Sequence, residues 1–285
     1  MARIAYVDGQ YVSLDTPAIY VEDRGYQFAD GVYEVCALRD TKLIDQDAHL
    51  KRLDYSLHEL GIAPPVSHAV LKHIIKEIIR RNRLANGLLY IQVTRGVAKR
   101  DHNYTNDMRP FLVVTGRPIT KGAREKAFAK GKSVVTLPDL RWKRCDIKSI
   151  SLLPNVLARK QASDQGCDEA WLVDENGFVT EAASANAWIV DQDGVLRSRK
   201  EDHAILNGIT RQVLFHVANK LGLPIELRPF TVEEALNAKE CFSTASTLVL
   251  TPVLKINGQT INTGEPGPFS KALAEHYDDV SQLLN

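Results

Sequence analysis

Hairpin signals are mixed with amphipathic helices along this chain, and this order constrains the possible folds more than any other feature. Asp8-Gly9 is a two-residue turn signal, so residues 4–13 are predicted to form a β-hairpin. Leucines recur at helical spacing over 47–60, and a second apolar stripe runs over 67–84. Because hairpins and helices are mixed, we expect two α+β domains and not one doubly wound sheet.

A stretch with one proline and two glycines at 116–122 is the best candidate for a domain linker. It predicts a smaller N-terminal domain over 1–117, a linker at 118–122 and a larger C-terminal domain over 123–285. Apolar and β-branched runs predict the remaining strands, which are 31–39, 88–95, 110–115, 133–137, 170–173, 178–180 and 187–190. The remaining helices are predicted at 154–166, 208–221 and 267–284, with a second hairpin at Asn257-Gly258.

The composition is that of an ordinary globular protein, with 44% hydrophobic and 25% charged residues in a chain of 285. The formal net charge of +1 gives no reason to expect nucleic acid or an acidic membrane surface as a partner. No signal peptide is expected at the start, and no apolar run approaches the roughly 20 residues of a membrane span. The cysteines lack the spacing of a zinc site or a disulfide framework, so we expect reduced thiols in a cytoplasmic protein at Cys36, Cys145, Cys167 and Cys241.

The stretch RWKRCDIKS (141–149) places one lysine, Lys148, shortly after Lys143 and Arg144. The apolar pair Leu152-Leu153 follows shortly after it. Desolvation and like-charge repulsion at this position are expected to make its amine lose a proton more readily. A neutral amine can attack an aldehyde and form a Schiff base, so Lys148 is a candidate nucleophile. The alternative is a surface lysine in a basic loop.

Other short segments occur in a fixed order between about residue 5 and residue 270. They are DRGYQF (23–28), DGVYEV (30–35), HLKRL (49–53), QVTRG (92–96), RDH (100–102), VTE (179–181), LNGITR (206–211) and TPV (251–253). Together they resemble the fold-type IV aminotransferases, and most closely the D-amino-acid branch of that family. The ordered set covers nearly the whole chain.

The resemblance implies an α+β, two-domain fold-type IV architecture and an enzyme that uses pyridoxal 5'-phosphate. In that family the lysine that matches Lys148 holds the cofactor as a Schiff base and later moves a proton between substrate and cofactor. The acid that matches Glu181 contacts the pyridine nitrogen and keeps the ring protonated. The larger domain, 123–285, is then the cofactor-binding domain.

The phosphate of such a cofactor needs hydrogen-bond donors, and the start of the predicted helix at Gly208 offers them. Free N–H groups and the helix dipole favour an anion there, and the glycine permits a close approach of the backbone. The resemblance assigns cofactor contacts to Arg52, Leu206, Ile209, Thr210 and Ser246. Ser246 and Thr247 match a hydroxyl pair near the phosphate, Thr247 being assigned to the substrate, and Ala245 stands where another hydroxyl is expected.

The resemblance also implies that Tyr33, Arg100 and His102 bind the α-carboxylate of a D-amino acid. A guanidinium fork suits a carboxylate, and the other two side chains add directional hydrogen bonds. In this branch the Arg-x-His pair comes from the neighbouring subunit, which implies a homodimer. Without the resemblance this is simply a charged loop, in which Asp101 could compete for Arg100. Arg141 is a further cation that could serve the phosphate or the substrate.

The expected reaction passes the amino group of D-alanine, or of a similar D-amino acid, to 2-oxoglutarate and yields pyruvate and D-glutamate. The alternatives with the same fold are an L-branched-chain aminotransferase, an aminodeoxychorismate lyase, and an enzyme for amines without a carboxylate. Val35-Cys36-Ala37 after Glu34, together with the Arg-x-His pair, favours the D-amino-acid branch. A non-enzymatic vitamin carrier would not need the lysine, the acid and the phosphate donors together.

Overall fold

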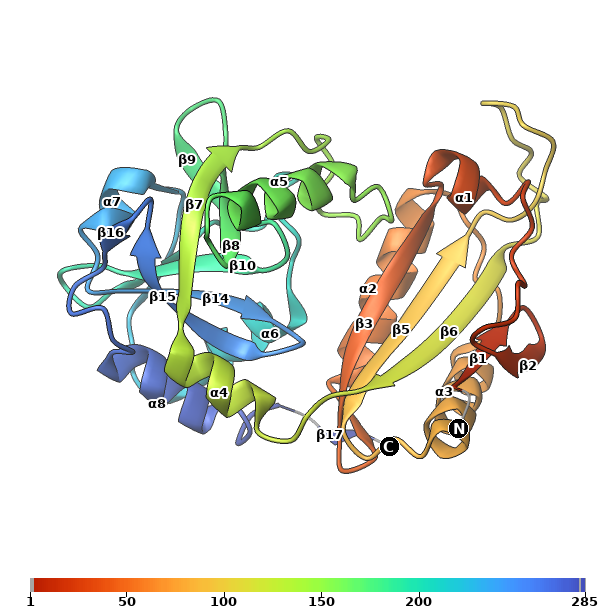
Figure 1. Cartoon of the computed structure of the whole chain (residues 1–285), viewed down its shortest axis with the longest axis horizontal. Coiled ribbons are helices and arrows are strands. Elements are labelled where there is room, and N and C mark those ends of the chain that lie inside the picture. Colours follow the sequence, from red (N-terminus) through yellow and green to blue (C-terminus); the bar gives the residue numbers. More distant parts are fainter. Residues whose placement is uncertain (1–2, 282, 285) are drawn as a thin grey trace. The chain divides into compact units, whose positions relative to one another are not determined.

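The computed structural model describes residues 3–281 and 283–284, and it divides into two compact units (Figure 1). The first unit contains the described residues up to Lys121, the segment Ile147–Ser151, and residues 283–284. The second unit contains Gly122–Asp146 and Leu152–Ser281. These units differ from the predicted domains mainly in the placement of Ile147–Ser151, and residues 1, 2, 282 and 285 of those domains lie outside the described part of the chain.

The first unit is built on a sheet whose strands lie in the order β17–β4–β3–β5–β6–β1–β2. The strands are β1 (Ile4–Val7), β2 (Gln10–Ser13), β3 (Gly31–Arg39), β4 (Lys42–Ile44), β5 (Gly87–Thr94), β6 (Phe111–Pro118) and β17 (Leu283–Leu284). The helices are α1 (Arg24–Phe28), α2 (Gln46–Glu59) and α3 (His68–Asn82). Helices α2 and α3 lie against this sheet (Figure 1), and their apolar stripes share one hydrophobic core with its buried side chains.

Local chemistry explains these elements. Asp8 and Gly9 both have positive φ angles, 41° and 100°, as a tight two-residue hairpin turn requires. Along β3 the alternate side chains are buried, and these are Val32, Glu34, Cys36 and Leu38. Facing this core are the predicted helical stripes, with Leu50, Leu53 and Leu57 from α2 and Leu71, Ile74, Ile75 and Ile78 from α3. The hairpin and both helices are therefore confirmed.

The segment Ile147–Ser151 is joined to the start of β3 by main-chain hydrogen bonds. The N–H of Tyr33 donates to the carbonyl of Lys148 at 3.0 Å, and the N–H of Ile150 donates to the carbonyl of Gly31 at 3.0 Å. The position of Lys148 is therefore set by the first unit, although the residues just before and after this segment belong to the second.

The second unit holds a larger sheet in the order β12–β11–β10–β14–β15–β7–β8–β9–β13, with β16 paired to β15. The strands are β7 (Lys132–Pro138), β8 (Glu169–Val173), β9 (Phe178–Ala182), β10 (Asn186–Val190), β11 (Leu196–Ser198), β12 (Ile225–Leu227), β13 (Phe230–Thr231), β14 (Glu240–Ala245), β15 (Val249–Ile256) and β16 (Gln259–Thr260). The helices are α4 (Ala123–Lys130), α5 (Leu153–Asp164), α6 (Ile209–Lys220), α7 (Val232–Leu236) and α8 (Pro268–His276).

The second sheet encloses apolar side chains from strands that are far apart in the strand order. Trp171 of β8, Ile189 of β10 and Cys241 of β14 belong to one core cluster. Another cluster packs α6 and α8 against the sheet, and a further one joins α5 to β7 and β8. Within the described residues, no helix is long and apolar enough to cross a membrane.

Most predicted elements of the second unit are confirmed, including α5, α6 and the strands β7 to β10. The predicted helix at 267–284 is wrong beyond His276, where α8 ends. Past that end the ring of His276 contacts Asp279 at 2.9 Å, and residues 283–284 pair with β4 as a strand. Residues 116–118, at the start of the stretch from which the linker at 118–122 was predicted, continue β6 and pair with β5, so the prediction is wrong at Pro118.

Candidate active site

The predicted site residues form two sets, one in each unit. The first unit carries Tyr33, Arg52, Arg100, His102 and Lys148. The second unit carries Glu181, Leu206, Ile209, Thr210, Ser246 and Thr247.

The amine of Lys148 lies over the ring of Tyr33. Its Nζ atom is 4.1 Å from the ring centroid, and the main-chain N–H of Lys148 donates to Oγ of Ser56 on α2 at 3.2 Å. The predicted nucleophile and the predicted substrate tyrosine are therefore neighbours, and the ring contact gives the amine a defined direction. Arg144, whose charge is expected to repel that of Lys148, is paired with Asp146 in the second unit at 2.8 Å.

A buried carboxylate, Glu34, holds the predicted phosphate-binding arginine. Arg52 donates from Nε to Oε1 of Glu34 at 2.7 Å and from Nη2 to Oε2 at 2.8 Å. Nδ1 of His49 lies 2.7 Å from the same Oε2. Burial by itself would raise the pKa of Glu34, but the charge and hydrogen bonds of Arg52, together with His49, hold that pKa well below its ordinary value.

Sequence reasoning missed the role of Glu34, which served only to distinguish branches of the family. The strand alternation places Glu34 on the face of β3 that carries Val32, Cys36 and Leu38. A charged residue on the apolar face of a strand needs a buried partner, and this was the available signal. The two parallel hydrogen bonds from Arg52 to Glu34 fix the plane of the guanidinium.

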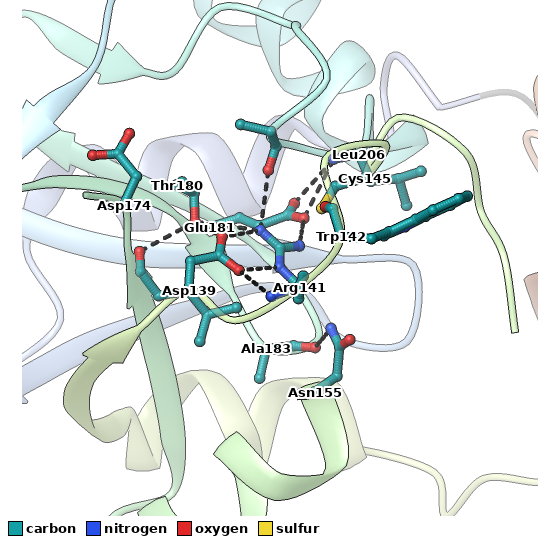
Figure 2. Close-up of polar contacts among 12 residues, drawn as sticks. Asp139, Arg141, Trp142, Cys145, Asn155, Asp174, Thr180, Glu181, Ala183 and Leu206 are labelled. Atoms are coloured by element: carbon teal, nitrogen blue, oxygen red, sulfur yellow. Dashed lines mark hydrogen bonds and ion pairs between the residues drawn. The ribbon is translucent and has the colours of Figure 1, made fainter. Parts of the chain in front are cut away.

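Glu181 lies on β9 within a network of donors (Figure 2). Nη1 of Arg141 contacts its carboxylate directly, Nδ2 of Asn186 donates to it at 2.9 Å, and the main-chain N–H of Leu206 donates at 3.3 Å. Burial raises the pKa of Glu181, and the positive charge of Arg141 opposes this rise. A buried acid of this kind can share a proton with a basic ring nitrogen.

Arg141, which sequence reasoning considered for the phosphate or the substrate, belongs to this network. Its Nε and Nη2 donate to the carboxylate of Asp139 at 2.9 and 2.6 Å, and Nη2 also donates to the carbonyl of Ala204 at 3.0 Å (Figure 2). Burial would lower the pKa of Arg141, but the charges of Glu181 and Asp139 raise it. These contacts engage Nε, Nη1 and Nη2 of Arg141 with Glu181, Asp139 and Ala204.

The N-terminal end of α6 lies next to Glu181. Gly208 precedes the helix and, having no side chain, does not cap the first turn, whose N–H groups have no partner inside the helix. A Cβ at Gly208 would lie 2.1 Å from Oδ1 of Asn186, which explains the glycine. Nδ2 of Asn186 also donates to the carbonyl of Leu206 at 2.8 Å. Asn186, which sequence reasoning missed, therefore joins Glu181 to a turn with the chemistry of an anion site.

Ser246 and Thr247 lie in the turn between β14 and β15. Strand β14 pairs with β10 so that Thr244 lies opposite Asn186. The turn therefore extends from the end of the sheet that carries Asn186. Ser246 is half-buried and Thr247 is exposed.

Arg100 and His102 lie on the segment between β5 and β6, and both are exposed. The ring of Phe28 on α1 contacts both residues. Cζ of Arg100 is 4.7 Å from the ring centroid of Phe28, and the His102 ring is 5.5 Å from it. Asp101, the expected competitor for Arg100, accepts the main-chain N–H of Asn103 at 2.9 Å. The two predicted carboxylate donors are thus brought together on one aromatic ring.

A sequence profile described as "Amino-transferase class IV" matches residues 31–256. The chain belongs to the class IV aminotransferases. The D-alanine aminotransferases of Bacillus licheniformis and of Staphylococcus aureus (strain MSSA476) are 40% and 34% identical to it over 264 and 274 residues. These alignments cover 93% and 96% of this chain, and 92% and 96% of the two relatives.

Solved structures of class IV aminotransferases share the fold. A branched-chain amino acid aminotransferase from T.th., solved with pyridoxamine 5'-phosphate, superposes with a TM-score of 0.90 at 24% identity, over 100% of this chain and 99% of that chain. The Escherichia coli branched-chain enzyme superposes with a TM-score of 0.88 at 20% identity, over 98% and 94%. The predicted α+β, fold-type IV class is confirmed.

Removing the charge of Glu34 should destabilise the protein in a pH-dependent way. Because its pKa in the folded protein lies below the ordinary value of 4.5, its ion pair stabilises the folded state above that pH. This stabilisation is lost as the pH falls from 4.5 towards the lower pKa that Glu34 has in the folded protein. Glu34→Gln is expected to lower the free energy of unfolding by about 3–5 kcal/mol at neutral pH, with a smaller difference near pH 3, in urea denaturation.

The matched control for this experiment is Glu77→Gln. Glu77 pairs with Arg80 and Arg81 on the surface of α3, where water screens the charges, so little change is expected. A cost of Glu34→Gln that is the same at both pH values would contradict the assigned ion pair.

Proposed function

We propose that this chain is a D-amino-acid aminotransferase that passes the amino group of D-alanine to 2-oxoglutarate and uses pyridoxal 5'-phosphate. The products are pyruvate and D-glutamate. The observation that carries the proposal is the pair Arg100 and His102 on Phe28, in a chain 40% identical to the D-alanine aminotransferase of Bacillus licheniformis. The branched-chain structures, at 24% identity or less, support the fold alone.

The donor chemistry of the described residues fits this cofactor. Glu181 offers a buried acid for the ring nitrogen, and the turn at Gly208 offers main-chain donors and a close approach for the phosphate. The residues proposed to hold the cofactor are Arg52, Lys148, Glu181, Leu206, Ile209, Thr210 and Ser246. When bound, pyridoxal phosphate supplies an electrophilic aldehyde and an electron-withdrawing ring.

Lys148 is proposed to act through its Nζ atom. As a neutral amine it would be the nucleophile, and afterwards it would move a proton between the substrate Cα and the C4′ atom of the cofactor. Nζ of Lys148 lies over the ring of Tyr33, 4.1 Å from its centroid. Glu181 holds a proton at the ring nitrogen, and Arg141 and Asn186 keep the carboxylate of Glu181 in place for that task.

The substrate carboxylate is proposed to bind Arg100, His102 and Tyr33, with Thr247 as a further hydroxyl donor. A guanidinium presents a planar fork of donors that matches the two oxygens of a carboxylate. An amino acid and a 2-oxo acid carry the same carboxylate next to the reacting carbon. One binding site can therefore serve both half-reactions.

We also propose a homodimer in which Arg100 and His102 reach the neighbouring active site. Tyr20, Val21 and Tyr26 are exposed apolar side chains, with 61%, 78% and 77% of their surfaces accessible. The stretch that carries them lies beside the segment with Arg100 and His102, because the N–H of Ala98 donates to the carbonyl of Glu22 at 3.3 Å. Exposed apolar surface of this kind is typical of protein contacts. The cytoplasmic location predicted from the sequence is part of this proposal.

Replacing the nucleophile tests the chemistry. Lys148→Ala is expected to lower turnover of D-alanine and 2-oxoglutarate by at least about 1000-fold, because the variant lacks the proton-transferring group. In the wild type, borohydride reduction should attach the cofactor to the peptide that contains Lys148, as read by mass spectrometry. The exposed Lys143 provides the control, since Lys143→Ala should keep both properties. Turnover retained in Lys148→Ala would refute the assignment.

Replacing the guanidinium tests the carboxylate site. Arg100→Ala is expected to raise KM for D-alanine by roughly 10- to 100-fold, the cost of a lost hydrogen bond to a charged group. The single-turnover rate with ethylamine, which is D-alanine without its carboxylate, should change little. An equal loss with both substrates would remove Arg100 from carboxylate binding.

A further inference from the structure

Arg24 binds the main chain of the segment that carries Arg100 and His102. Its Nη1 donates to the carbonyl of Asp101 at 2.6 Å and to that of Asn103 at 3.3 Å, and its Nη2 donates to the carbonyl of His102 at 3.3 Å. One guanidinium therefore binds the carbonyls of consecutive residues. The side chain of Arg24 is 5% exposed, so water competes little for these hydrogen bonds.

Asp30 holds Arg24 together with a second arginine. Nε of Arg24 donates to Oδ2 of Asp30 at 2.8 Å, and Arg95 forms a fork to the same carboxylate at 2.8 and 3.0 Å. Arg95 also donates to the carbonyls of Leu60 and Gly61 at 2.8 and 3.1 Å. Burial would raise the pKa of Asp30, but the two arginines lower it. Arg24 is therefore anchored to the sheet and to the end of α2 by an ionised carboxylate.

The start of α1, from which Arg24 projects, is fixed to β5. The carboxylate of Asp23 accepts the N–H groups of Gly25 and Tyr26 at 2.8 and 3.4 Å, and the hydroxyl of Thr94 donates to it at 2.8 Å. A Cβ on Gly25 would lie 2.2 Å from Cγ2 of Thr94, so the close approach requires glycine. In the Asp23-Arg24-Gly25 motif, to which the resemblance assigned no role, Asp23 and Gly25 therefore hold the backbone of Arg24 in a fixed position.

The same helix also contacts the side chains of the segment. The ring of Phe28, one helical turn after Arg24, lies 4.8 Å from Cζ of Arg24 and also contacts Arg100 and His102. The ring of Tyr104, further along the segment, lies 5.4 Å from Cζ of Arg24. Residues of α1 therefore contact both the backbone and the side chains of the segment that carries Arg100 and His102.

From these contacts we infer that Arg24 is a positioning residue for the substrate carboxylate. It fixes the backbone of residues 101–103, so that Arg100 and His102 present their donors in one orientation. The inference rests on the proposed function, in which those two side chains bind the carboxylate. A guanidinium suits this task because its planar set of donors reaches Asp30 and several carbonyls at once. A lysine ammonium is a compact point charge and cannot reach all of these acceptors.

The variant Arg24→Lys tests this role, because it keeps the charge next to Asp30 and loses the fork. KM for D-alanine and for pyruvate is expected to rise by roughly 10- to 100-fold, as for a binding group displaced by about 1 Å, while kcat changes little. The matched control is Arg197→Lys, which weakens the two hydrogen bonds from Arg197 to Oδ2 of Asp191 in the second unit. That variant should lose stability without any change in KM. A similar rise of KM in both variants would overturn the inference.

Two further measurements separate positioning from general damage. In a double-mutant cycle, Arg24→Lys should raise KM much less in the Arg100→Ala background than in the wild type, since it acts through Arg100. Fully additive effects would overturn the inference. Amides of residues 98–108 in the holoenzyme should exchange hydrogen faster in Arg24→Lys and not in Arg197→Lys. Unchanged exchange would also overturn it, and because this readout needs no substrate, it tests Arg24 even if the proposed D-alanine activity fails.

Discussion

A carboxylate removed from water costs several kcal/mol unless a cation and hydrogen bonds compensate, and this constraint shapes each part of the proposed site. Glu34 is fully buried and is matched by the fork of Arg52. Glu181 is matched by Arg141 and Asn186. Asp30 is matched by Arg24 and Arg95. In each case the geometry that satisfies the carboxylate also fixes a group on which the proposed chemistry depends.

The proposed site residues are divided between the two units. In the proposed function the first unit carries the nucleophile Lys148, which main-chain bonds to β3 place beside Tyr33, and the carboxylate donors Arg100 and His102, which serve the neighbouring active site. The second unit carries the proposed acid for the ring nitrogen and, at the start of α6, the proposed donors for a phosphate. Hydrogen bonds within each unit hold these groups in place, which reduces the cost of organising the site during turnover.

The sequence predicted the features that local patterns determine. Asp8-Gly9 predicted its hairpin, and the leucine stripe predicted α2, because turn chemistry and helical periodicity act over a few residues. The partners of Glu34, Asn186 and Arg141 could not be predicted, since they are brought close only by the fold, although the place of Glu34 on an apolar strand face indicates that it needs a buried partner. The attachment of residues 147–151 to β3 uses main-chain groups, which leave no signal in side chains. The helix predicted at 267–284 is too long at its C-terminal end, where residues 283–284 pair with β4, a contact that is also non-local.

The most direct test of the central claim is a half-reaction of the purified holoenzyme. The absorbance of the bound cofactor is followed after addition of D-alanine or of L-leucine alone, without a 2-oxo acid. The proposed function predicts that D-alanine converts the cofactor to its amine form and that L-leucine leaves the spectrum unchanged. Conversion by L-leucine alone would contradict the D-amino-acid assignment and the roles given to Arg100 and His102.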